Sequence, residues 1–408
     1  MKLIFILAAV LNGIYRTVLN ILNYKSAKNP IPENVSDVYD AENYKKWKSY
    51  NAENFRLYAI STLVSLAITI SLLATDVYAL FAALWPSNIS AQIFSVILLE
   101  SVMRTIVDTV FSYIGTMKIE EKYGFNRSSK KTFVIDKIRG FIVELLISCG
   151  MVYALAFIHR SMGDMMIVLF AAVIFVIAML ISFLYPFFSR IGNKFTPLED
   201  GELKDSLTKL LTKYGYKVRA IEVMDASRRT TKLDAYFTSF GKMKTIVLYD
   251  NLVNSMTTDE ICAVFAHELG HGLHRDVLKN QMLNIIHILI ISVTVWFAVR
   301  TPEFHHAFGF SEVNYGFAYI LLSIALGVIE PLTGIVLNAL SRKAEYRADK
   351  QAVKEGYGRA MVTSLKKLAK ENFANLSPSP FVVFMEYSHP PCNKRIEAVE
   401  KACEKYNR

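Results

Sequence analysis

The chain has 408 residues, of which 53% are hydrophobic and only 20% are charged, and its mean hydropathy is +0.29. An ordinary soluble domain carries about 25% charged residues, so this composition argues against a string of soluble domains. A net charge of +10 is compatible with nucleic-acid binding. In a membrane protein, however, excess Lys and Arg mark cytoplasmic loops, and no nucleic-acid partner is expected. The four cysteines show no paired spacing and predict free thiols.

Apolar residues gather in seven blocks that are long enough, at about 20 residues each, to cross a bilayer as helices. The blocks lie at 3–23, 57–84, 90–115, 138–158, 164–188, 280–299 and 316–340. The first block resembles a signal peptide because Lys2 precedes it, but no small-residue cleavage site follows. We therefore interpret it as a membrane span.

The connections between the blocks alternate in charge. Those after the first, third, fifth and seventh blocks are rich in Lys and Arg, whereas those after the second, fourth and sixth hold at most one basic residue. Because basic connections stay in the cytosol, this alternation places the N-terminus outside. It places both 189–279 and 341–408 on the cytosolic side.

The segment 189–279 is polar enough for a small soluble unit. It is expected to form a helix near 199–215 and strands near 217–223, 235–240 and 244–249. This reading divides the chain into four parts. They are 1–188 with five spans, 189–279 in the cytosol, 280–340 with two spans and 341–408, a helical cytosolic tail.

The motif formed by His267, Glu268 and His271 is the candidate metal-binding and catalytic site. Thr257 and Glu260 predict a capped helix start before it. Because residues four apart share one face of a helix, both imidazoles can bind a single ion. Glu268 can then accept a proton from a water whose pKa zinc lowers from about 16 to about 7. The alternative is an ordinary helix with two surface histidines.

Catalytic zinc usually has three protein ligands, so a third is needed. Six residues beyond His271 stands Val277, and His274 is too close on the same helix. Glu345 is the better candidate, since it follows the seventh block at the same membrane face. Asp349, one turn later, is placed to orient a ligating histidine. Taken alone, this stretch also reads as an amphipathic helix with surface charges.

Together with this motif, several segments resemble the type I CAAX prenyl proteases, which are integral-membrane zinc metalloproteases of the gluzincin type. The resemblance covers most of the chain, and its segments occur in the family's order. They are 120–126, 195–204, 267–271, 341–349 and 387–391. The resemblance implies a mainly α polytopic membrane protein with about seven transmembrane helices enclosing a hydrated chamber, plus a small α+β zincin-like cytosolic unit.

The resemblance also implies roles for individual residues. His267, His271 and Glu345 match the family's zinc ligands, and Glu268 matches its general base. His389 matches a histidine to which the family gives the role of stabilising the tetrahedral intermediate. A hydrogen-bond donor aimed at the oxyanion of that intermediate contributes about 3–4 kcal/mol. A further match is Arg395, which follows the Pro-Pro pair as an arginine of the family does and is expected to contact substrate.

One segment departs from the family pattern. Where the family has Asn-Ala-Tyr, this chain has Asp234, Ala235 and Tyr236. Asp234 keeps the capacity to accept a hydrogen bond but loses the amide donor. The three residues are still expected to bind substrate, because strand addition relies on backbone groups.

The third block carries Glu100, Arg104 and Asp108 at spacings of four, on one face of a helix. Charges at membrane depth usually face a bundle interior or a water-filled cavity. Two readings remain open. The residues form a ladder in which both acids pair with Arg104, or they serve the reaction directly.

The predicted function is removal of the terminal three residues of prenylated CAAX proteins, with a second upstream cut as an extension. Lipidated substrates suit an enzyme within the bilayer. The family resemblance implies the endoplasmic reticulum membrane, with the active site open to the cytosol. Two alternatives are a quality-control metalloprotease for membrane proteins and an inactive scaffold, which only the Asp234 departure supports.

Overall fold

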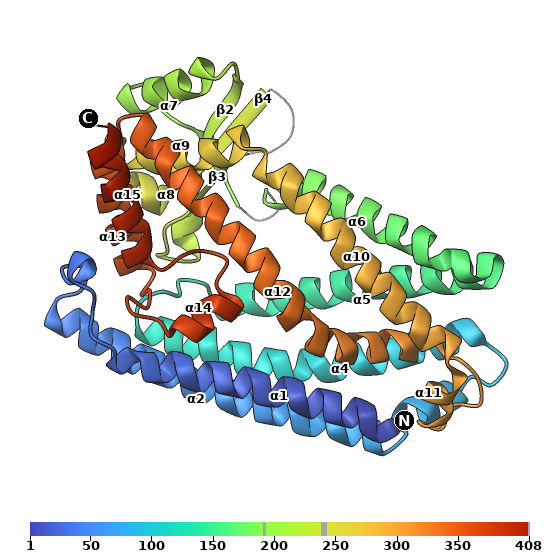
Figure 1. Cartoon of the computed structure of the whole chain (residues 1–408). Helices are drawn as coiled ribbons and strands as arrows, with labels where there is room; N and C mark the ends of the chain where they lie inside the picture. The colour runs from blue at the N-terminus through green and yellow to red at the C-terminus, as the bar shows by residue number, and fades with distance from the viewer. Residues whose placement is uncertain (191–192, 238–242, 407–408) are drawn as a thin grey trace.

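The long apolar stretches of the sequence form long helices (Figure 1). The computed structural model describes residues 1–190, 193–237 and 243–406. The helices that correspond to the seven apolar blocks are α1 (Lys2–Lys25), α2 (Ala41–Ala74), α4 (Ile89–Ile114), α5 (Lys130–Met162), α6 (Met166–Phe188), α10 (Asp276–Arg300) and α12 (Tyr315–Lys354).

Five helical stretches of the described chain are long and apolar enough to cross a membrane. One of them, Lys130–Leu184, holds both α5 and α6, which meet at a short turn where Gly163 has a φ of 55°. The five stretches therefore account for six of the seven predicted spans. The remaining one, α4, is 26 residues long but is not among the five, and it carries the three charged residues noted above.

Two blocks differ from their predicted limits. The block at 57–84 is broken, because α2 ends at Ala74 and a short helix, α3 (Val77–Ala83), begins after Asp76. Asp76 has a φ of 56°, the left-handed conformation that Asp tolerates better than most residues. By contrast, α12 continues without a break beyond the membrane block, even through Pro331. Glu345 and Asp349 thus stand on the rigid extension of a membrane helix.

The charged face of α4 does not form a ladder with itself. Arg104 pairs with Glu144 of α5, and Asp108 pairs with Lys137 of α5. Glu100 accepts a hydrogen bond from the hydroxyl of Tyr78 on α3. The ladder reading is therefore wrong: the partners come from neighbouring helices, whose packing the spacing along one helix cannot reveal.

Two cavities lined by both polar and apolar residues lie between these helices. One, of about 630 Å³, is lined by polar residues of α1 and α2 together with Asn338 of α12 and Tyr387. A second, of about 460 Å³, is lined by Glu100, Arg104 and Asp108. The two share lining residues on α1, α2 and α4. The charged face of α4 thus lines a cavity between helices.

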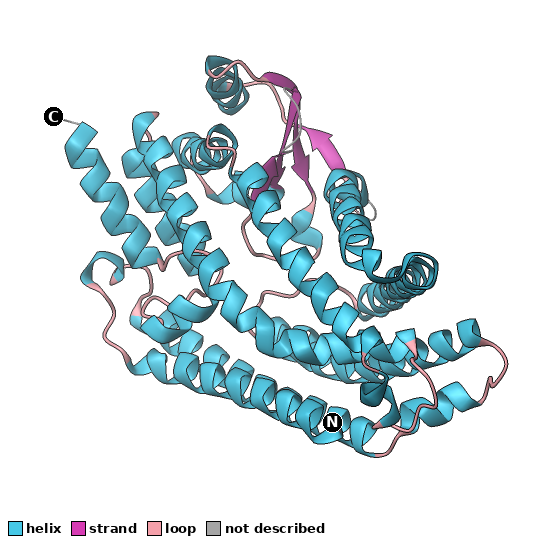
Figure 2. Ribbon diagram, turned by 45° about the vertical axis from the view of Figure 1, so that its right-hand side comes forward, coloured by secondary structure: helices cyan, strands magenta, loops and turns pink. Residues whose placement is uncertain are grey.

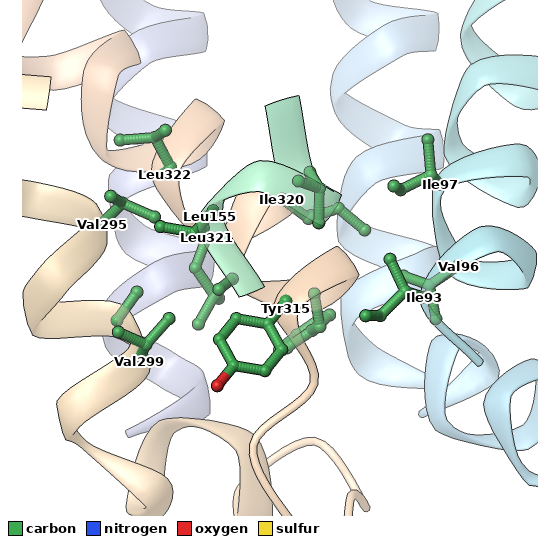
Figure 3. Packing of buried hydrophobic residues seen from close by; sticks show 14 of the residues in the cluster. Ile93, Val96, Ile97, Leu155, Val295, Val299, Tyr315, Ile320, Leu321 and Leu322 are labelled. Carbon is green, nitrogen blue, oxygen red and sulfur yellow. The ribbon is translucent and has the colours of Figure 1, made fainter. Parts of the chain in front are cut away.

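An apolar cluster packs the helices together at the end of the bundle far from the sheet (Figure 1). Figure 3 shows part of this cluster from close by. Phe308 and Phe317 are among its fully buried side chains. Residues from α4, α5, α10 and α12 interlock there, among them Ile93, Val96, Ile97, Leu155, Val295, Val299, Tyr315, Ile320, Leu321 and Leu322. This packing holds α10 against α12, whose opposite end carries Glu345.

A small sheet stands at the other end of the bundle (Figure 2). Its strands are β1 (Phe195–Pro197), β2 (Lys217–Met224), β3 (Ala235–Phe237) and β4 (Met243–Tyr249), in the order β1-β2-β4-β3. β2 and β4 are parallel, and the other neighbours are antiparallel. The three predicted strands are present, although positions 238–240 of the second lie outside the described residues. β1 is too short to show alternation in the sequence.

Short helices complete the structure. The predicted helix at 199–215 is shorter, since α7 spans Glu202–Lys213. The others are α8 (Asp250–Ser255), α9 (Thr258–Leu273), α11 (Pro302–His306), α13 (Gly358–Glu371), α14 (Pro380–Glu386) and α15 (Cys392–Tyr406). Near the sheet, α9 packs between α7, α12 and α13 (Figure 1). The helix that bears the histidine motif is therefore enclosed by elements that precede it and elements that follow it in the chain.

Candidate metal centre

The histidine motif lies on α9, whose start is capped as predicted. The side chain of Thr257 accepts a hydrogen bond from the backbone N–H of Glu260, and the Glu260 carboxylate accepts one from Thr257 in return. One turn separates His267 from His271, and their Nε2 atoms are 3.3 Å apart. Both imidazoles thus point at a common position on the surface of the helix.

Glu345 approaches this position from α12. Its Oε1 is 3.2 Å from Nε2 of His271, and its Oε2 is 3.6 Å from Nε2 of His267. The close approach depends on Gly270, because a Cβ there would lie 2.9 Å from the Cα of Ala348. The glycine inside the motif therefore lets α12 press against α9 and bring its carboxylate to the histidines.

These three residues could hold a metal ion. Each offers one ligand atom, and the three atoms all lie within 4.8 Å of one another. Oε2 of Glu345 is buried and accepts no hydrogen bond within the described part of the chain. Burial raises the pKa of Glu345, but His271, His267 and Arg395 outweigh it and hold the pKa below its usual value. The carboxylate is therefore ionised at neutral pH, the state that binds a metal.

Asp349, one turn beyond Glu345, lies behind His267. Its Oδ1 is 2.8 Å from Nδ1 of His267, so the imidazole donates to the carboxylate and keeps Nε2 free. Burial raises the pKa of Asp349, but the hydrogen bond from His267 and the charge of Arg395 hold it at about 2. The sequence placed Asp349 here through its helical spacing from Glu345.

Arg395 lies on α15, next to Asp349 and His267. Its side chain is 13% exposed, and it donates to both oxygens of Asp349 at 2.9 and 2.6 Å. Its Nη1 is also 3.4 Å from Oε2 of Glu345. The sequence predicted a substrate contact for this residue, whereas the structure brings it to the carboxylates behind the histidines.

His271 has a backing carboxylate of its own, which the sequence analysis did not identify. Its Nδ1 lies 3.1 Å from Oδ2 of Asp276, the first residue of α10. An acidic residue five positions after the second histidine was the only signal in the sequence. His274, which was rejected as a ligand, is the C-cap of α9 and lies outside the three-residue group.

Glu268 and β3 share a small pocket beside the histidines. Ala235 and Tyr236 line it together with Glu268 and apolar residues of α9 and β4. In the described sheet β3 pairs only with β4, so its other edge is on the outside of the sheet. Next to the strand, Oδ1 of Asp234 accepts the N–H of Ala235 at 2.8 Å. The residues predicted to bind substrate thus adjoin the predicted base.

His389 reaches the centre from the segment between α14 and α15. Its Nε2 is 3.4 Å from Oε1 of Glu345, and its side chain is 65% exposed. Arg342 holds the start of this segment against α12 by donating to the carbonyl oxygens of Val383 and Tyr387. His389 therefore stands on the open side of the three ligand atoms, where a donor can meet a substrate.

Comparison with known proteins supports the same assignment along the whole chain. The sequence model described as "CAAX prenyl protease N-terminal, five membrane helices" matches residues 20–190, and that of peptidase family M48 matches 197–403. The chain is 28% identical to CAAX prenyl protease 1 of Saccharomyces cerevisiae, over 93% of this chain and 91% of the relative. It is 27% identical to the Arabidopsis thaliana CAAX prenyl protease 1 homolog, covering 95% and 94%.

A solved structure extends the likeness to three dimensions. The crystal structure of S. mikatae Ste24p superposes with a TM-score of 0.91 at 27% identity, covering 98% of this chain and 99% of that one. The metallopeptidase match alone spans more than half of the chain. The protein is therefore an integral membrane metalloendopeptidase that belongs to peptidase family M48, with the N-terminal helices of the CAAX prenyl proteases.

Proposed function

We propose that this protein is a zinc-dependent endopeptidase that removes the C-terminal three residues of prenylated CAAX proteins, with a second upstream cut as an extension. One observation carries the proposal. His267, His271 and Glu345 converge in a chain that is similar from end to end to relatives named CAAX prenyl protease 1. A prenyl chain partitions into lipid, so a substrate of this kind meets an enzyme in the bilayer.

The geometry of the three side chains supports zinc as the metal. Ligand atoms at 2.0–2.2 Å from a tetrahedral ion lie about 3.3–3.6 Å apart. Here the two Nε2 atoms are 3.3 Å apart, Oε1 of Glu345 lies 3.2 Å from Nε2 of His271, and the other carboxylate oxygen, Oε2, lies 3.6 Å from Nε2 of His267. Two imidazoles and one carboxylate are also a ligand set that catalytic zinc uses, with a fourth position left for water.

The reaction divides among this chain's residues. Zinc, when bound, supplies a Lewis acid and lowers the pKa of water to about 7. Glu268 takes a proton at its carboxylate and delivers it to the leaving amine. His389 donates a hydrogen bond to the oxyanion of the tetrahedral intermediate. β3, at Ala235 and Tyr236, binds the substrate as an added strand.

Asp349 and Arg395 act behind the ligands. Asp349 orients His267, and Arg395 neutralises Asp349. We assign Arg395 a positioning role in place of a substrate contact, because its guanidinium is buried against two carboxylates. The hydrogen bonds to Asp349 use its Nε and one Nη atom.

We propose that the active site opens to the cytosolic face of the endoplasmic reticulum membrane. The charge alternation supports this orientation, since 189–279 and 341–408 are themselves basic segments, which stay in the cytosol. The same alternation supports the four-part division of the chain at residues 188, 279 and 340. Substrates prenylated in the cytosol would then reach the centre from the side where they are made.

The test is hydrolysis by the purified full-length protein of a farnesylated CAAX peptide and of its unprenylated counterpart. We expect tripeptide release from the farnesylated peptide, loss of that activity with a zinc chelator, and recovery on adding zinc. Cleavage of unfolded membrane proteins without tripeptide release would favour the quality-control protease instead. Failure to cut either substrate or to bind zinc would favour the scaffold.

Replacing Asp234 with Asn is expected to raise tripeptide release at neutral pH. An amide donates to a substrate carbonyl, whereas an ionised carboxylate repels it, and we expect kcat/KM to rise about tenfold. Partial burial raises the pKa of Asp234. The difference in kcat/KM between Asp234→Asn and the wild type should therefore become smaller as the pH falls towards the pKa of Asp234. Near that pKa the protonated carboxyl of the wild type also donates a hydrogen bond to the substrate carbonyl. Paired pH profiles of kcat/KM measure this.

Asp200→Asn is the matched control, since Asp200 is almost fully exposed and pairs only with Lys204 in the described chain. Its pH profile should follow that of the wild type. A lower kcat/KM for Asp234→Asn at neutral pH would show that the carboxylate itself is needed at this position.

A further inference from the structure

We propose that Asp276 is a second positioning residue of the metal centre. It accepts a hydrogen bond from Nδ1 of His271, which holds that imidazole in the tautomer and orientation for binding and ties it to the membrane helices α10 and α12. The inference rests on the proposed zinc site and adds to it a residue that the motif does not contain.

The contacts of Asp276 set the tautomer of His271. Its side chain is 5% exposed, and its Oδ1 accepts from Nη2 of Arg347 at 2.7 Å. Its Oδ2, 3.1 Å from Nδ1 of His271, accepts a hydrogen bond, so the imidazole carries a hydrogen on Nδ1. The ring nitrogen that remains available to a metal is Nε2. It faces Nε2 of His267 at 3.3 Å and Oε1 of Glu345 at 3.2 Å.

A strained turn brings Asp276 to the histidine. On a continuous helix, a residue five positions further on points about 140° away. Here α9 ends at Leu273, and α10 begins after Arg275, which has a φ of 54° and a ψ of 37°. An arginine rarely adopts this left-handed conformation, and such backbone strain gathers at functional sites. Because of this turn, the carboxylate of Asp276 points towards His271, whereas on a continuous helix it would point away.

Each of the two histidines therefore donates to a carboxylate that is paired with an arginine. His267 donates to Asp349, which Arg395 neutralises, and His271 donates to Asp276, which Arg347 neutralises. The origins of the partners differ. Asp349 and Arg395 belong to α12 and α15, whereas Asp276 and Arg347 belong to α10 and α12. Asp276 is the first residue of α10, so its hydrogen bond links His271 directly to a membrane helix.

A purely structural role for Asp276 makes a different prediction. An acid in the first turn of α10 stabilises that helix, and its pairing with Arg347 fastens α10 to α12. Removing it would then lower the stability of the protein without changing its affinity for metal. Zinc affinity and the stability of the metal-free protein must therefore be measured separately.

The test compares wild type, Asp276→Asn and a matched control, Asp259→Asn, as full-length proteins in detergent. Asp259 is the corresponding first-turn acid of α9 and lies outside the three-residue ligand group. The zinc dissociation constant is obtained by competition with a chromophoric chelator. We expect Asp276→Asn to raise it about 10–100-fold, as removal of such partners does elsewhere. The control should stay within about twofold of wild type, and cobalt-loaded Asp276→Asn should show shifted visible bands.

Equal dissociation constants for wild type and Asp276→Asn, with a lower thermal midpoint of the metal-free variant, would overturn the inference and leave the zinc site standing. A wild type that binds no zinc would overturn the proposed function itself. If Asp276→Asn does not fold, the zinc dissociation constant of Asp276→Glu is measured in its place. It keeps the charge beside Arg347 but displaces the carboxylate from His271, so an unchanged dissociation constant would again overturn the inference.

Discussion

Replacing Glu268 with Gln is expected to reduce kcat for tripeptide release about 10²–10⁴-fold, the contribution of a positioned general base. Gln has nearly the same shape but cannot take a proton from water. The three ligand side chains are untouched, so the zinc dissociation constant should stay within about threefold of the wild type. Single-turnover hydrolysis of a farnesylated peptide, with metal content measured on the same sample, gives both quantities.

Glu260→Gln is the matched control on the same helix. Glu260 belongs to the helix cap and pairs with Lys367, away from the metal centre. Its removal should leave kcat within about twofold of the wild type. Two results would contradict the role given to Glu268. One is a variant that keeps most of its activity, and the other is a variant that loses its zinc.

Replacing Arg395 with Met is expected to lower the free energy of unfolding of the metal-free protein by about 3–5 kcal/mol, the range for breaking a buried ion pair. The substitution leaves Asp349, which is 1% exposed, without its cation. It also removes the guanidinium near Glu345. Thermal unfolding in detergent measures the loss, and metal binding by the variant should weaken because His267 is no longer held firmly.

The neighbouring substitution Lys394→Met serves as the control. Lys394 is 58% exposed and pairs with Glu397 on the surface, so its loss should cost less than about 1 kcal/mol. The two roles considered for Arg395 separate in this experiment. A raised KM with unchanged stability would favour the substrate contact, whereas a large loss of stability favours the positioning role.

Most of the fold was predictable because its signals are local. Apolar length marked the helices, and the five membrane-competent stretches cover six of the seven predicted spans. The positions of the strands followed from alternation and β-branched residues. What was missed also has local causes: β1 is too short to alternate, and the break at Asp76 rests on one residue in a left-handed conformation.

The candidate metal centre was partly predictable for the same reason. His267 and His271 are one turn apart, and Asp349 stands one turn from Glu345, so the helical period placed each pair on one face. Bringing the two pairs together required α9 to pack on α12. Gly270 permits that contact, but nothing in its local sequence says which backbone it will meet.

The sequence by itself determined the membrane helices, the motif on α9 and the chemical types of the ligands, because these depend on the period and polarity of single elements. Only the tertiary structure decided which charges become partners. Arg104 pairs with Glu144, Arg395 with Asp349, and Asp276 with His271. The first two pairs join residues far apart in the chain, and the third depends on the turn at Arg275. Their contacts follow from how whole helices pack, which spacing along one helix does not encode.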